Sequence, residues 1–138
     1  MLNENRKILL DFRLEQAYGC LKEANIMIEA DAYKGAANRS YYCIFHAMRA
    51  MLALDGFDSK KHSGIISKFR EKYIKTNVFP KEFSGIIKQS YNNRGKCDYD
   101  DFFVISKEET TKQLDNAKTF LSAVEAYIET LGVETAEK

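Results

Sequence analysis

Hydrophobic residues recur every three or four positions along most of the chain, a spacing that places them on one face of an α-helix. Five stretches show this pattern, and short connections join them. The sequence therefore predicts an all-α fold in which five helices form an antiparallel bundle. The predicted helices cover residues 8–30, 36–54, 59–74, 80–93 and 106–131.

The second predicted helix is the most apolar, with hydrophobic side chains nearly all the way round. Such a helix usually lies at the centre of a bundle. Gly56 marks its end, because glycine readily adopts the left-handed conformation common at helix C-termini. The last helix begins with a capping box of Ser106 and Glu109 and ends before Gly132. Residues 94–103 are predicted to be a loop.

The composition fits one domain spanning residues 1–138, with a helical core over residues 8–131 and a flexible tail over residues 132–138. Hydrophobic residues make up 45% of the chain and charged residues 30%, which suffices for both a core and a polar surface. No stretch approaches the roughly 18–20 apolar residues that a membrane helix requires, so we expect no membrane association.

Three cysteines, Cys20, Cys43 and Cys97, form an odd count without the spacing of a metal site. The apolar stretch near the N-terminus covers only residues 8–10, which is too short for a signal peptide. We therefore expect reduced thiols and a cytoplasmic protein, with Cys20 and Cys43 packed in the core.

Charge is distributed unevenly along the sequence, although the net charge is only +1. Residues 59–97 hold ten basic and two acidic side chains, whereas residues 98–138 hold four basic and ten acidic ones. The basic stretch could attract phosphate, or the two stretches could form complementary faces of a dimer. A solvated helix surface would explain the same pattern.

Several kinds of chemistry require residues that this chain lacks. Neither His46 nor His62 completes the Glu-x-x-His pairs of a di-metal bundle, and no zinc set or phosphate-binding glycine loop is found. The acidic residues Asp98, Asp100 and Asp101 are interpreted as a solvated turn. The sequence therefore predicts neither a metal ion nor a cofactor.

Two polar stretches are unusual for a plain bundle: residues 38–46, in the most apolar helix, and residues 94–100. Burying an arginine is costly unless it is paired. We therefore expect Arg39 to meet a carboxylate or to lie at the bundle end, and Arg94 to pair with Asp98. Tyr41 and Tyr42 are interpreted as core residues rather than as stacking platforms for bases.

These stretches resemble the small stand-alone HEPN proteins. The resemblance rests on A-x-N-R-S-Y-Y-x-x-F-H-A from Ala36, K-H-S-G-I-I-x-x-F from Lys61 and R-x-x-x-D-Y-D from Arg94, and it spans about residues 8–130. It implies a five-helix, four-helix-bundle-like fold that forms a homodimer. It also implies a minimal nucleotidyltransferase as partner in a toxin–antitoxin pair, and many HEPN domains are metal-independent endoribonucleases.

The catalytic signature of that family is an Arg, four to six residues and a His. Arg94 matches the Arg, and Tyr99 stands where the His would be. A tyrosine with a pKa of about 10 is a poor general base, although it could orient a phosphate held by Arg94. Arg39 and His46 also fit the Arg-x6-His spacing, but they lie in the central helix, where a structural, hydrogen-bonded His46 is favoured.

The candidate phosphate- or ligand-binding residues are therefore Asn38, Arg39, His62, Arg94, Asp98 and Tyr99. The catalytic candidates are Arg94, Tyr99, His46 and His62; for His62, capping or a tertiary hydrogen bond is the competing interpretation.

Three functions stay open. The first is a homodimeric partner of a nucleotidyltransferase that binds nucleotide or RNA phosphate through Arg94. The second is a metal-independent endoribonuclease toxin, and the third is a purely structural dimer.

Overall fold

The computed structural model describes residues 4–132 and confirms the all-α class, with no strand in that range. The helices are α1 (Glu4–Glu29), α2 (Tyr33–Ala53), α3 (His62–Phe69), α4 (Glu82–Tyr99) and α5 (Lys107–Thr130), and α3 continues into a π-helical turn, η1 (Arg70–Ile74). The predicted tail over residues 132–138 lies, apart from Gly132, outside the described residues.

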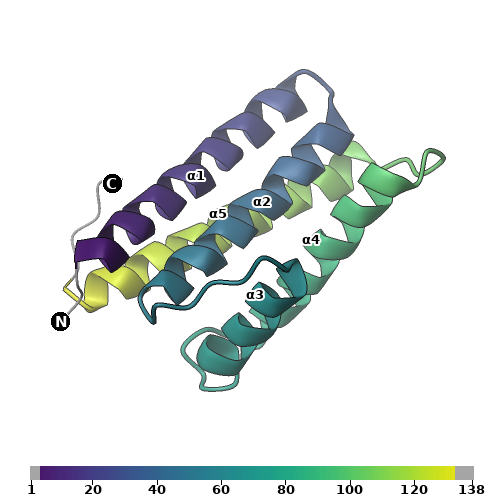
Figure 1. Cartoon of the computed structure of the whole chain (residues 1–138). Helices are drawn as coiled ribbons and strands as arrows, with labels where there is room; N and C mark the ends of the chain where they lie inside the picture. The colour runs from purple at the N-terminus through teal and green to yellow at the C-terminus, as the bar shows by residue number, and fades with distance from the viewer. Residues whose placement is uncertain (1–3, 133–138) are drawn as a thin grey trace.

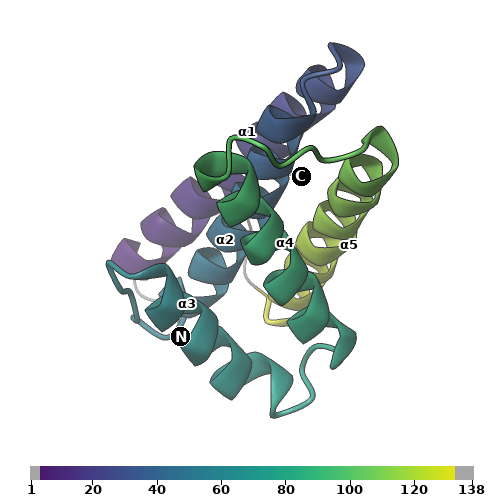
Figure 2. The same cartoon turned by 90° about the vertical axis from the view of Figure 1, so that its right-hand side faces the viewer.

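The four long helices run in alternating directions along the chain, so that α1 and α2 are antiparallel and so are α4 and α5 (Figure 1). α2 contacts α1, α3, α4 and α5, which confirms its predicted central position. Figure 2 shows α4 between α3 and α5 on one side of the bundle. The long α2 is thus the element against which every other helix is placed.

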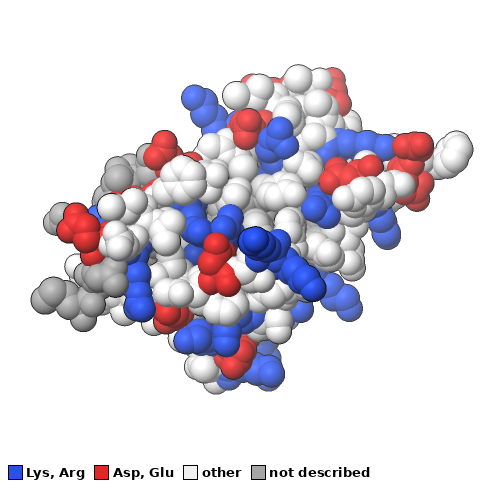
Figure 3. All heavy atoms as spheres, viewed as in Figure 1, with Lys and Arg blue, Asp and Glu red and all other residues white. Residues whose placement is uncertain are grey.

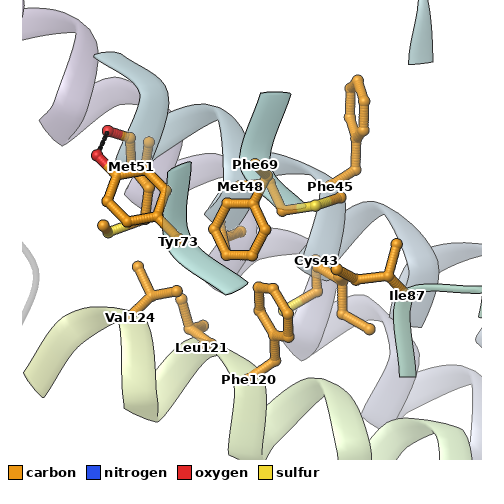
Figure 4. Packing of buried hydrophobic residues seen from close by; sticks show 14 of the residues in the cluster. Cys43, Phe45, Met48, Met51, Phe69, Tyr73, Ile87, Phe120, Leu121 and Val124 are labelled. Carbon is orange, nitrogen blue, oxygen red and sulfur yellow. Dashed lines mark hydrogen bonds between the residues drawn. The ribbon is translucent and has the colours of Figure 1, made fainter. Parts of the chain in front are cut away.

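The core is built mainly from aromatic and long aliphatic side chains that α2, α3 and α5 direct toward one another (Figure 4). Phe120 on α5 is fully buried. Its ring centre lies 5.6 Å from the ring centre of Phe69 and 4.9 Å from that of Phe83. Tyr73 lies at one end of the core, where its hydroxyl donates a hydrogen bond to the Asp55 carboxylate at 2.6 Å and lies 3.3 Å from the Met51 carbonyl oxygen. Burial of these rings holds α3 and α5 against α2.

The predicted loop over residues 94–103 is wrong in its first part, because α4 continues through Tyr99. Gly95 and its asparagine neighbours are weak helix formers, which favoured an earlier end. Tertiary packing overrides this preference: Cys97 is buried against Ala37 and Ile105. The helical continuation puts Arg94 and Asp98 one turn apart on the same face.

The predicted helix ends are largely confirmed. Ser106 caps α5 by accepting a hydrogen bond from the Glu109 amide at 3.0 Å, while the Glu109 carboxylate accepts one from Gln89 at 2.6 Å. Gly56 follows α2 with a φ of +71° and Gly132 follows α5 with a φ of +74°. None of the helices within residues 4–132 is long and apolar enough to cross a membrane.

Candidate functional site

Arg94 lies on α4 among three tyrosines. Its guanidinium carbon is 5.4 Å from the ring centre of Tyr41, 5.7 Å from that of Tyr42 and 5.8 Å from that of Tyr91. Its Nη2 also donates a hydrogen bond to the Tyr42 hydroxyl at 3.1 Å. Burial lowers the pKa of Arg94, but the net effect is a raised pKa. The raising causes are the hydrogen bond to Tyr42, the hydroxyls of Tyr42 and Tyr41, and the charge of Asp98. The structure therefore holds a permanent cation against aromatic faces.

A continuous polar chain joins Arg94 to Arg39. Arg94 Nε forms an ion pair with Asp98 Oδ2 at 3.4 Å, and Asn38 Nδ2 donates hydrogen bonds to both Asp98 carboxylate oxygens at 3.4 and 3.5 Å. Arg39 donates to the Asn38 side-chain oxygen at 2.6 Å and pairs with Glu23 on α1 at 3.3 Å. The expected carboxylate partners of both arginines are confirmed, and this polar chain joins α1, α2 and α4.

His62, the first residue of α3, lies against the same three tyrosine rings. Its Nδ1 and the Tyr41 hydroxyl are hydrogen-bonded at 2.7 Å, and its ring stacks on Phe45 at 4.2 Å between centres. From the sequence, a tertiary hydrogen bond is the alternative to a ligand-binding role for His62, and this hydrogen bond is present. Burial, followed by the charges of Arg94 and Arg49, lowers the pKa of His62. Its imidazole is accordingly neutral at physiological pH.

His46 also lies against Tyr42, at 6.0 Å between ring centres. Contrary to the expectation of a hydrogen-bonded structural histidine, its buried Nδ1 has no hydrogen-bond partner within residues 4–132. Burial, followed by the charges of Arg49 and Arg13, lowers the pKa of His46 to about 4. Tyr42 thus contacts both histidines and Arg94.

Tyr99 lies apart from this cluster. It lies five positions after Arg94 on α4, which turns its side chain about 140° around the helix axis from that of Arg94. Its side chain is 80% exposed. We define the Arg94 cluster as Arg94, Asp98, Asn38, Arg39, Tyr42 and His62. Of the predicted site residues, His46 lies next to this cluster, against the Tyr42 ring, and Tyr99 lies outside it.

The cluster offers cations, amide and phenol groups and a neutral imidazole, which suit an anionic ligand rather than a metal ion. Within residues 4–132, no three His, Cys, Asp or Glu side chains lie close enough together to hold a metal ion. Asp100 and Asp101 are exposed, and Asp100 accepts a hydrogen bond from the Phe102 amide at 3.0 Å.

The interpretation of Tyr42 as a core residue is incomplete. Tyr41 is fully buried, as expected, but Tyr42 is only partly buried and accepts the Arg94 hydrogen bond. Asn38, Tyr42 and His46 are spaced by four residues on α2, and Tyr91, Arg94 and Asp98 by three and four on α4. These two helical stripes could have indicated which face of each helix is polar, but not that the two faces meet.

The basic stretch over residues 59–97 forms the surface next to the cluster, on α3, η1 and α4. Figure 3 shows several Lys and Arg side chains around the part of the surface where Figure 1 places α3. Some of these charges are compensated: Lys68 pairs with Glu71 at 3.4 Å and Lys72 with Asp55 at 3.9 Å. Other lysines, such as Lys81 and Lys88, are exposed.

Comparison with known proteins places these features in a family. The sequence profile of the HEPN domain matches residues 10–127. A "UPF0332 protein" of Thermotoga maritima is 30% identical over 94% of this chain and 98% of its own. Two proteins of Methanocaldococcus jannaschii, "Putative toxin MJ0142" and "Putative toxin MJ0605", are 32% and 33% identical, over 86% and 72% of this chain and 81% and 74% of their own.

Proposed function

Because this chain belongs to the HEPN domain family, we propose that it is the helical, toxin-like component of a toxin–antitoxin pair and binds RNA or nucleotide phosphate through Arg94. The names of the two M. jannaschii relatives support the toxin-like role. The observation that carries the binding role is the polar chain from Arg94 through Asp98 and Asn38 to Arg39.

The phosphate of the ligand would bind Arg94 by replacing the Asp98 carboxylate. The Arg94 side chain is only 14% exposed, and its carboxylate partner Asp98 is 33% exposed. A phosphate carries oxygens that can replace those of Asp98 in the contact with the guanidinium. Asn38 and the more exposed Arg39 would then supply donors beside the incoming phosphate.

Fluorescence anisotropy of a labelled single-stranded RNA tests this proposal. Arg94→Gln removes the charge, and we expect its affinity for RNA to fall about tenfold, as for the loss of a charged hydrogen bond. Lys107→Gln, an exposed charge change at the start of α5, is the matched control and should leave the affinity unchanged. Equal affinities of Arg94→Gln and wild type, with both folded by circular dichroism, would refute a phosphate contact at Arg94.

The basic surface over residues 59–97 makes a separate contribution that salt can reveal. Binding of phosphates by Lys and Arg releases counterions, so RNA affinity should fall steeply as salt is added. An affinity that does not respond to salt would refute RNA binding by this surface.

A metal-independent endoribonuclease is the second candidate function, and the position of His62 favours it. A neutral imidazole beside a fixed cation could accept the proton of a ribose 2′-hydroxyl in place of the histidine that Tyr99 replaces. RNA should then be cleaved by the wild type without divalent metal, and cleavage should be lost in both Arg94→Gln and His62→Gln but kept in Tyr99→Phe. Intact RNA after incubation with the wild type would exclude this activity for the substrates tested.

The homodimer and the nucleotidyltransferase partner are also part of the proposal. Support comes from an exposed apolar patch on α1, where Ile8, Leu9 and Phe12 are 60%, 43% and 54% exposed. Sedimentation of the wild type should give a dimer, and Phe12→Glu should dissociate it if the patch is the dimer interface. If the patch binds the partner instead, Phe12→Glu should prevent co-purification with a nucleotidyltransferase encoded by a neighbouring gene. A monomer that captures no such partner would contradict both assignments. We place this function in the cytoplasm, where the three free cysteines would stay reduced.

A further inference from the structure

A cavity of about 360 Å³ opens between α3 with η1 on one side and α4 on the other. Its apolar lining comes from Ile66 on α3 and from Ile87 and Tyr91 on α4. Tyr91 is 38% exposed, so part of its ring faces solvent. The volume lies at the lower end of the range of small-molecule sites, about 300–1,000 Å³.

The polar lining of this cavity is cationic. Arg70, Lys75 and Lys88 line it, and no described carboxylate does. Arg70 donates a hydrogen bond from Nη2 to the Ser84 carbonyl at 3.2 Å, but its buried Nε has no hydrogen-bond partner among the described residues. A buried cationic donor without an acceptor is costly. An anion in the cavity would supply the missing acceptor.

The π-helical turn explains how two of these cations share the cavity. The Lys75 amide donates to the Arg70 carbonyl at 2.9 Å, the i to i+5 bond of a π-helix. This wider turn lets both side chains line the same cavity, whereas five residues of α-helix would separate them by about 140°. π-helical turns are found frequently at functional sites.

From the apolar lining, the three cations and the unpartnered Arg70 donor, we infer that this cavity binds one unpaired nucleotide. The base lies against Tyr91 and Ile66, and the phosphate meets Arg70, Lys75 and Lys88. Either a free nucleoside monophosphate or one nucleotide of a single-stranded RNA offers this chemistry, because an unstacked base is available in both. The inference goes beyond the proposed function, since the cavity requires no contact with Arg94.

Backbone amide chemical shifts, followed by NMR during a titration with AMP, test the inference on the full chain. Ser67→Phe places a ring at an exposed cavity-lining position and keeps every charge, so it should abolish AMP binding. Lys88→Gln should weaken AMP binding about tenfold through the loss of a charged contact. Lys81→Gln makes the same charge change outside the cavity lining and should bind like the wild type.

Several results would overturn the inference. The inference is wrong if AMP shifts no amides of α3, η1 and α4 at millimolar concentration, if Ser67→Phe binds AMP as the wild type does, or if Lys81→Gln weakens binding as much as Lys88→Gln. Inorganic phosphate that binds as tightly as AMP would also contradict a contact with the base. Loss of AMP binding in Arg94→Gln alone would move the ligand to the Arg94 cluster.

The RNA anisotropy assay identifies the source of the nucleotide. If RNA affinity falls in Ser67→Phe together with AMP binding, the cavity takes a nucleotide of a single strand. If only AMP binding is lost, a free nucleotide is the ligand. Arg94 contacts Tyr91 in the cavity wall, so Arg94→Gln alone does not separate the two sites. Lys88 lines the cavity and lies outside the Arg94 cluster. Loss of AMP binding in Ser67→Phe and Lys88→Gln therefore tests the cavity, whereas loss of RNA binding in Arg94→Gln with normal RNA binding in Lys88→Gln tests the Arg94 cluster.

Discussion

Replacing His46 by Gln should reduce the dependence of folding stability on pH, because partial burial and nearby positive charges keep the His46 imidazole neutral in the folded protein. Its Nδ1 has no hydrogen-bond partner within residues 4–132, and Arg49 and Arg13 lie close enough for their charges to oppose protonation. Burial is the larger cause, and together these effects lower the pKa of His46 from 6.5 to about 4. Both arginines pair with Asp58, so they stay beside His46 in the folded protein.

The sign and size of the effect follow from this pKa difference. Between pH 6.5 and about 4 the unfolded chain binds a proton at His46 that the folded protein does not. Stability is therefore unaffected by this group above pH 6.5 and decreases as the pH falls toward 4. One pKa unit corresponds to about 1.4 kcal/mol, so about 3 kcal/mol is the upper bound for the loss from His46, and solvent at its partly exposed ring reduces it.

Urea denaturation at several pH values between 7 and 4 measures this loss. The free energy of unfolding of the wild type should fall over that range, and His46→Gln should remove most of the fall. His62→Gln should remove a further part in the same direction, because the pKa of His62 is also lowered. Burial raises the pKa of Asp58, but hydrogen bonds from Arg49 and Arg13 outweigh it and lower the pKa to about 2. The stability that Asp58 contributes is therefore lost at lower pH than the stability that depends on neutral His46. Parallel pH curves for the wild type and His46→Gln would refute the reasoning.

Three further substitutions test the packing and the helix end by urea denaturation at pH 7. Phe120→Ala removes a fully buried ring and should cost about 3–5 kcal/mol, so a cost near zero would contradict the described core. Ser106→Ala removes the oxygen that accepts from the Glu109 amide and should cost about 1 kcal/mol, with Ser106→Asp retaining the stability. Tyr73→Phe removes the hydrogen bond to Asp55 and should cost about 1–2 kcal/mol; an unchanged midpoint would show that this bond does not stabilise the fold.

Periodicity and capping chemistry predicted much of the fold. The all-round apolar pattern of α2 identified the central helix, and the Ser106 cap follows from local chemistry alone. The end of α4 was mispredicted, since the helix preferences of Gly95 and its neighbours are local whereas the packing of Cys97 is tertiary. The π-turn at Arg70 has no comparable local signal in the sequence.

The sequence predicted the ion pair of the candidate site, but not the contacts that α4 makes with α2. The ion pair of Arg94 with Asp98 lies within one helical turn, so its spacing is visible in the sequence. The hydrogen bond from Arg94 to Tyr42 joins residues 52 positions apart. Only the packing of α4 on α2 creates such a contact, and no pattern within either helix fixes it.

The most direct test of phosphate binding by exchange is to compare the RNA affinities of Asp98→Asn and Arg94→Gln at the same salt concentration. If phosphate replaces the Asp98 carboxylate at Arg94, removal of that competing charge should strengthen RNA binding, whereas Arg94→Gln should weaken it about tenfold. If the pair is only structural, the two substitutions would change RNA affinity in the same direction or leave it unchanged, and that result would contradict the account.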